Sequence, residues 1–373
     1  MSVASRVGRL ASFASRTTFD TSIHRGNPQK ANGRGAKSYA ELRRRVIAAG
    51  LLDSSYGYYA LLASVLAAGL VGVAALLVFL PGWGDVVAVA LLALVMVQFG
   101  FLVHDAGHMQ IFRSVRNNRI VGLICAPMLL GVSFEAWVDK HNAHHAHVNE
   151  VDDDPDINHP LIAFTPEQAA ERTGWTRWLV RYQGRLYFVL AMFATIGFRA
   201  DAWMHVIRGR GRASTRIELA CIIVNHIVWL IIPSVLLGPG RWLPVFFITQ
   251  LIVGVYMVSV FAPNHKGMPF IRGRRPTFLE QQVLTARNVN AGPIGDLFYG
   301  GLNYQIEHHL FPNVARNRMP ELRQIVKPFC HEVGLSYEEN DPITAYRLLI
   351  WQLEAIGRGE DPGPLPKMGE STV

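Results

Sequence analysis

Charged residues are scarce in this 373-residue sequence. Asp, Glu, Lys and Arg make up 17% of it, against about 25% in ordinary soluble domains, whereas 50% is hydrophobic. The three cysteines, Cys125, Cys221 and Cys330, are too few and too scattered for a disulfide framework or a cysteine-based metal site. The net charge of +8 is not accompanied by a zinc-finger, helix-turn-helix or RNA-recognition pattern, so nucleic acid is not the expected partner. This composition favours a membrane protein.

Long uncharged or nearly uncharged runs support this class. A helix of about 20 residues crosses a hydrocarbon layer of about 30 Å, and four runs are of this size: 57–80, 86–103, 219–238 and 243–262. Two shorter runs, 121–134 and 186–198, are expected to lie at the membrane interface or to insert only half-way. The first two long runs are joined by PGWGD and the last two by little more than GPGRW. We therefore predict four transmembrane helices arranged as two hairpins.

The distribution of basic residues predicts the orientation of these hairpins. Residues 1–50 carry ten Lys or Arg against two acids, and 199–216 contains Arg199, Arg208, Arg210, Arg212 and Arg216. Short loops rich in Lys and Arg remain on the cytoplasmic side. Both termini and the middle segment are therefore expected to be cytoplasmic, with anionic lipid headgroups or an acidic redox partner as neighbours.

Three parts of the chain are predicted on this basis. They are a basic N-terminal cytoplasmic segment (1–50), a membrane domain (51–340) and a C-terminal cytoplasmic tail (341–373). The first twenty residues are expected to be a basic tail rather than a targeting signal. The Gly/Pro-rich end GRGEDPGPLPKMGESTV is expected to be mobile.

Histidines carry the chemical signal. Eight of the fourteen occur in HDAGH, HNAHH, PNHK and QIEHH at the ends of the predicted spans: His104, His108, His141, His144, His145, His265, His308 and His309. In the first two motifs, spacings of three and four residues place the imidazoles on one face of a helix. Since two hairpins return the chain to one side of the membrane, groups far apart in sequence can meet in one cytoplasmic site.

Crowded imidazoles indicate a metal. A single histidine is more often a hydrogen-bonded packing residue, but several together repel when charged and are left unsatisfied when buried, unless a cation binds their lone pairs. A zinc ion takes about four ligands and an octahedral ion six, so eight nitrogens indicate two ions. Zinc, copper and iron all accept imidazole, and the ligand count leaves the element open.

The order HDAGH, HNAHH and QIEHHLFP around these runs resembles the membrane fatty acid desaturase family with its three histidine boxes, from about residue 51 to about residue 337. NAGPIGDLFYGGLNYQIEHHLFP is similar to the third-box region of front-end desaturases and of certain actinobacterial acyl desaturases. The resemblance implies a cytoplasmic helical cap that holds a non-haem di-iron centre. Such a centre uses O2 and two electrons to remove two hydrogens from neighbouring methylenes of an acyl chain.

The resemblance also implies a role for each matching residue. The eight clustered histidines match the metal ligands, with His265 in the place of a further ligand after the last span. Gln305 stands where many desaturases have a histidine, as front-end members show, and three roles stay open for it: metal ligand, partner of a bound water, or shaping of the site. Asn264 is a poorer match to the family's water-bridging asparagine.

Carboxylates near the boxes are candidates for orienting the imidazoles. Asp105 and Glu307 lie inside boxes, and the run EVDDDPD after the second box contains Asp152, Asp153, Asp154 and Asp156. Among the candidates we favour Asp156. The alternative for this run is a solvated turn before Pro155.

The reaction implied by the family agrees with the residue types. An unactivated methylene has neither an acidic proton nor an electrophilic centre, so O2 activated at a metal is needed, and imidazoles bind iron without being oxidised as thiolates would be. The chain contains no HPGG haem motif, cysteine-rich iron–sulfur pattern or dinucleotide fingerprint. A separate donor, a ferredoxin or flavin reductase, is therefore expected, in an arrangement typical of a bacterial plasma membrane.

Three alternatives remain open from the sequence. A di-iron hydroxylase or ketolase acting on a lipid would use the same ligands. A membrane zinc hydrolase would leave half of the eight histidines unexplained, and a haem-binding electron carrier needs only one or two axial histidines per haem. The acyl carrier, coenzyme A or a lipid, is also left open.

Overall fold

The computed structural model describes residues 33–209, 213–272 and 276–362. Within this part of the chain regular structure is mostly helical, and strands β1 (Asn288–Val289) and β2 (Glu339–Asn340) form one short parallel pair. The predictions for the first twenty residues, for Arg210 and Arg212, and for residues 363–373 lie outside the described residues.

Among the described residues, four helices are long and apolar enough to cross a membrane. They are α3 (Tyr56–Phe79), α4 (Trp83–Gly107), α13 (Pro239–Phe261) and the continuous helix Ala213–Leu237, which contains α11 (Ala213–His226), the π-helix η6 (Ile227–Ile231) and α12 (Ile232–Leu237). These bounds agree with the predicted runs to within a few residues, except that α11 begins six residues before its run. The chain is thus an integral membrane protein.

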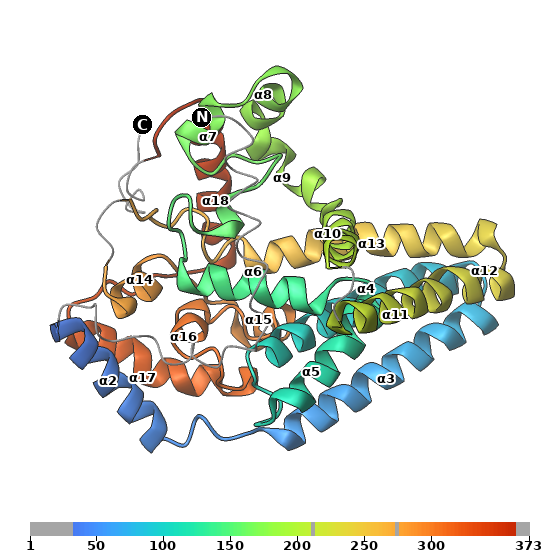
Figure 1. Cartoon of the computed structure of the whole chain (residues 1–373), viewed down its shortest axis with the longest axis horizontal. Coiled ribbons are helices and arrows are strands. Elements are labelled where there is room, and N and C mark those ends of the chain that lie inside the picture. The colour runs from blue at the N-terminus through green and yellow to red at the C-terminus, as the bar shows by residue number, and fades with distance from the viewer. Residues whose placement is uncertain (1–32, 210–212, 273–275, 363–373) are drawn as a thin grey trace.

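Burial distinguishes the two helices of the first pair. In the most apolar 18-residue window of α3 only 17% of the residues are buried, whereas in that of α4 61% are buried. α4 packs between α3 and α13 (Figure 1). At the end far from the histidines, Arg241 of GPGRW donates to Asp85 of PGWGD at 2.6 Å and to the Leu77 carbonyl. This contact ties the two connecting loops together.

The two shorter apolar runs coincide with sharply bent helices. α5 (Val115–Leu123) and the π-helix η4 (Ile124–Leu130) meet α6 (Phe134–Ala146) at 110°, and α9 (Gln183–Ala191) meets α10 (Ala194–Arg208) at 65°. Gly131, at φ +74°, supplies the left-handed turn of the first bend. The described residues thus hold four candidate spans, or up to six if each bent pair is one span.

The remaining helices gather at one end of the four long ones, which we call the histidine end (Figure 1). They are α2 (Gly33–Ala48), α7 (Pro166–Ala170), α8 (Gly174–Arg181), α14 (Phe278–Leu284), α15 (Gly292–Tyr299), α16 (Gln305–Leu310), α17 (Met319–Glu332) and α18 (Pro342–Gly357), with 3-10 turns η5 (Pro155–Ile157) and η7 (Arg316–Arg318). Leu42 and Val46 of α2 share a core with Leu310 and Leu322, and Leu353 of α18 is fully buried. Helices on both sides of the predicted boundaries at 50 and 340 therefore pack on the membrane domain; the boundaries themselves stay a prediction.

Candidate metal centre

Four elements bring the eight clustered histidines together. α4 carries His104 in its last turn and ends before His108, α6 carries the second-box histidines, His265 follows α13, and α16 carries His308 and His309. His104 therefore belongs to a membrane helix, whereas the other seven lie outside the four long helices. Seven of the eight side chains are buried, and His141 is half-buried. The predicted convergence of distant histidines is thus present in the fold.

The imidazoles form two groups, each able to hold an ion. In both groups the ligand atoms lie within 4.8 Å of one another: His104, His108, His141 and His308 in the first, and His144, His265 and His309 in the second. His145 lies between them, because its Nε2 is 3.1 Å from His308 Nε2 while its ring stacks on His309 at 4.2 Å.

The close approach of ring nitrogens fits a metal-binding centre. His104 Nε2 lies 3.1 Å from His308 Nε2, and His265 Nε2 lies 3.1 Å from His309 Nε2. Burial lowers the pKa of His265 to about 3 and, with neighbouring histidines adding to the effect, holds the pKa of His309 well below its usual range. These rings are therefore neutral at pH 7, the form that offers a lone pair to a metal.

The opposite ring nitrogens contact fixed acceptors. His309 Nδ1 lies 2.8 Å from Gln282 Oε1, His265 Nδ1 lies 3.2 Å from the Thr285 carbonyl, and His144 Nδ1 lies 3.0 Å from Asp154 Oδ1. A ligand histidine characteristically donates its second N–H to a carboxylate or carbonyl, which sets its tautomer and ring orientation. With Nδ1–H donated outward, each of these three rings directs its Nε2 lone pair into the cluster.

The carboxylate that contacts His144 directly is Asp154, not the favoured Asp156. Asp154 also accepts from the backbone N–H groups of Asn149 and Asp156, both at 2.8 Å, so its carboxylate is held rigidly. Asp156 lies 3.7 Å from His144 Nδ1 and pairs with Lys140 at 3.0 Å. Sequence order could not separate these neighbouring acids, because a tight turn rather than a helix presents them; Asp152 has φ +76°.

The two carboxylates inside the boxes differ in their contacts. Asp105 Oδ1 lies 3.5 Å from His104 Nδ1, while Asp105 Oδ2 forms a buried ion pair with Arg316 at 2.9 Å. Glu307 does not face the imidazoles; it accepts from Tyr337 Oη and Asn288 Nδ2, both at 2.7 Å. Glu307 thereby ties α16 to the segments that contain Asn288 and Tyr337.

Gln305 is directed into the second group of histidines. Its Nε2 lies 2.9 Å from His265 Nε2, and its Oε1 accepts from Asn264 Nδ2 at 3.1 Å. Asn264 also donates to the Leu302 carbonyl at 2.9 Å, which places it behind Gln305 and away from the ring nitrogens. The side chain of Gln305 therefore occupies a position from which an imidazole could reach the same group.

We expect Gln305→His to retain the metal content of the unmodified chain, because the added imidazole replaces the amide beside His265. Metal analysis of purified protein checks this, with Gln305→Leu as the control that removes all polar atoms at the position. Loss of metal from a folded Gln305→His variant would contradict the placement of Gln305 at the edge of the metal site.

Several contacts were not predicted from the sequence. The ring of Trp137 stacks on His141 with centroids 4.6 Å apart, and Arg199 of α10 donates to Asn225 at 3.1 Å instead of facing outward as a loop arginine. The four-residue spacing of Trp137 and His141 could have indicated their contact. Gln282 and Arg316 contact His309 and Asp105, which are too far away in the sequence for a local spacing to predict the contacts.

The fold and site define a class: an integral membrane protein whose clustered, buried imidazoles are compatible with a metal centre. The family then follows from comparison with known proteins. A model of the family "Fatty acid desaturase" matches residues 81–340. The chain belongs to this family, which confirms the resemblance seen in the histidine boxes, and it is an enzyme of the fatty acid desaturase class.

Curated relatives cover most of the chain. The Acyl-lipid (9-3)-desaturase of Physcomitrium patens is 31% identical over 81% of this chain and 59% of its own length. The Delta(8)-fatty-acid desaturase of Euglena gracilis is 28% identical over 91% of this chain and 83% of its own length. The Delta(6)-fatty-acid desaturase fat-3 of Caenorhabditis elegans is 31% identical over 85% of this chain and 74% of its own length.

Proposed function

We propose that this chain introduces a double bond into a fatty acyl chain at a non-haem di-iron centre, with O2 as co-substrate. The division of the imidazoles into two adjacent groups carries this proposal. The proposed ligands are His104, His108, His141, His144, His145, His265, His308 and His309. When bound, two irons would supply the activation of O2 that abstraction of hydrogen from a methylene requires.

The chain's own residues contribute orientation and exclusion of water. Asp154, Gln282 and the Thr285 carbonyl hold three of the rings through Nδ1. Burial of seven of the eight imidazoles separates the centre from bulk solvent. An all-imidazole donor set suits iron as well as zinc, and no cysteine lies in either histidine group.

The relatives and the fold support the proposed substrate and its surroundings. The three relatives are named as one acyl-lipid desaturase and two fatty-acid desaturases, so the proposed substrate is an acyl chain carried by a lipid or by coenzyme A. Electrons come from a separate ferredoxin or reductase. Two membrane hairpins, with both termini and the histidine end in the cytoplasm of a bacterial cell, complete the proposal.

A double-bond-resolved fatty acid profile tests the reaction. Cells that express this chain with a ferredoxin and its reductase are expected to accumulate an unsaturated fatty acid that cells expressing His308→Ala lack. A hydroxylated product instead would support the alternative of a hydroxylase. Purified protein is expected to hold two irons per chain, and a single zinc would overturn the di-iron assignment.

A further inference from the structure

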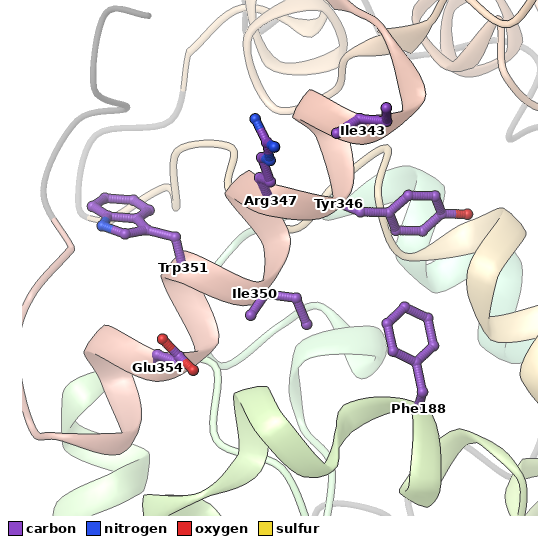
Figure 2. Close-up of a pocket in the computed structure, with 7 residues that line it drawn as sticks. All are labelled: Phe188, Ile343, Tyr346, Arg347, Ile350, Trp351 and Glu354. Atoms are coloured by element: carbon purple, nitrogen blue, oxygen red, sulfur yellow. The ribbon is translucent and has the colours of Figure 1, made fainter. Parts of the chain in front are cut away.

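An open groove runs between α9 and α18, outside the histidine cluster. Its volume is about 540 Å³, within the range of about 300–1,000 Å³ found for small-molecule sites. Figure 2 shows Phe188 of α9 facing Tyr346 and Ile350 of α18, while Arg347 and Trp351 extend from the neighbouring face of α18. One side of the groove is therefore apolar, and its rim carries a cation and an indole.

The groove lies level with the last turns of a membrane-spanning helix. Tyr346 Oη donates to the Ser259 carbonyl in α13 at 2.8 Å. The bend that follows α9 rests on the same helix, because a Cβ added to Gly254 would meet the Ala191 carbonyl oxygen at 2.5 Å. Phe188, three residues before this bend, thus lies where the span reaches the membrane boundary.

Apolar side chains next to the groove are uncovered. Val189 of α9, Phe193 in the bend and Ile196 of α10 are 50%, 52% and 59% exposed, and Ile343 at the start of α18 is 64% exposed. In water such a surface would be unfavourable. Because α9 and α10 both pack on the membrane-spanning helix α13, acyl chains of the bilayer are the expected cover for this surface.

The charges at the rim favour an anionic headgroup. Glu354 is matched by Arg185 at 3.8 Å, whereas Arg347 is exposed and has no hydrogen bond or ion pair among the described residues. Trp at a membrane boundary commonly lies at headgroup level, and an arginine there attracts anionic lipid. Arg347 and Trp351 together match a phosphate above an acyl chain.

We propose that the groove between α9 and α18 binds an anionic phospholipid of the leaflet at the histidine end, with one acyl chain along Phe188, Tyr346 and Ile350 and the phosphate on Arg347. This site does not involve the histidine cluster and does not depend on the proposed reaction. It holds a lipid at the surface of α18, the helix whose Tyr346 is tied to the end of α13.

Photolabelling in nanodiscs tests this site. The full chain is placed in phosphatidylcholine discs that contain a small fraction of phosphatidylglycerol with a diazirine in one acyl tail, and labelled peptides are mapped by mass spectrometry. We expect label on 183–191 and 343–354 to exceed that on α3, which reports ordinary lipid contact. Arg347→Ala should lower this ratio about fivefold, as expected for one basic residue at an anionic surface.

Two further variants separate binding from general damage. Ile350→Trp fills the groove and should lower the same ratio, whereas Arg358→Ala, at the exposed end of α18 where Arg358 pairs with Glu360, should leave it unchanged. Label equal to that on α3, or a ratio unaffected by Arg347→Ala, would overturn the proposal. Absence of lipid label combined with crosslinks from an acidic ferredoxin to 343–354 would also overturn it, in favour of a protein partner.

Discussion

We expect replacement of His308 by alanine to abolish the proposed desaturation and to remove metal from the protein, while the chain still inserts into the membrane. His308 Nε2 lies 3.1 Å from both His104 Nε2 and His145 Nε2, so it joins the first group of imidazoles to the histidine between the groups. Loss of a residue that merely supports a ligand lowers metal affinity or activity by about 10–100-fold. We expect removal of the ligand itself to lower metal affinity and activity by more than about 100-fold.

Membrane insertion should be unaffected, because α16 lies outside the four long helices. Desaturated product and metal per chain are measured on the same membrane preparation, and extraction with carbonate reports insertion. His331→Ala is the matched control, since His331 is an exposed histidine on α17. His141→Ala should behave like His308→Ala, and full activity in either variant would remove that residue from the ligand set.

Hydropathy and local spacing account for what the sequence predicted well. The four spans follow from uncharged runs, because a helix in lipid needs apolar side chains along its whole length. HDAGH and HNAHH likewise place their imidazoles by helical spacing: α4 carries His104 and ends just before His108, and α6 carries the three histidines of HNAHH. The expectation that these motifs meet QIEHH rested on one further assumption, namely that all of them lie at the same end of the spans.

Contacts between distant segments explain what could not be predicted. Gln282 meets His309 because α14 packs on α16. Arg316 of η7 meets Asp105 near the end of α4, more than 200 residues earlier in the chain. Neither residue differs in local pattern from an ordinary surface glutamine or arginine. The orienting role of Asp156 stays a prediction: Asp154 lies nearer to His144, at 3.0 Å against 3.7 Å, and the turn geometry decides which acid approaches the ring.

Arg316→Met is expected to be strongly destabilising, because it leaves the Asp105 carboxylate buried without its partner. The ion pair is almost fully enclosed, with exposed side-chain fractions of 4% for Arg316 and 2% for Asp105. Breaking such a pair by removing one partner typically costs about 3–5 kcal/mol. Thermal unfolding in detergent measures the loss. Because Asp105 lies 3.5 Å from His104 Nδ1, we also expect weaker metal binding.

The double variant Asp105→Asn with Arg316→Met distinguishes a paired charge from simple packing. Removing both charges leaves no unpaired ion, so the double variant should be more stable than Arg316→Met alone, since a buried pair is commonly replaceable by neutral groups of similar volume. Arg316 also lies over the rings of Tyr58 and Phe101, at 5.9 and 5.8 Å. The destabilisations caused by the two substitutions could instead simply add. In that case the ring contacts rather than the ion pair would account for the effect of Arg316, and Asp105 would orient His104 without help from Arg316.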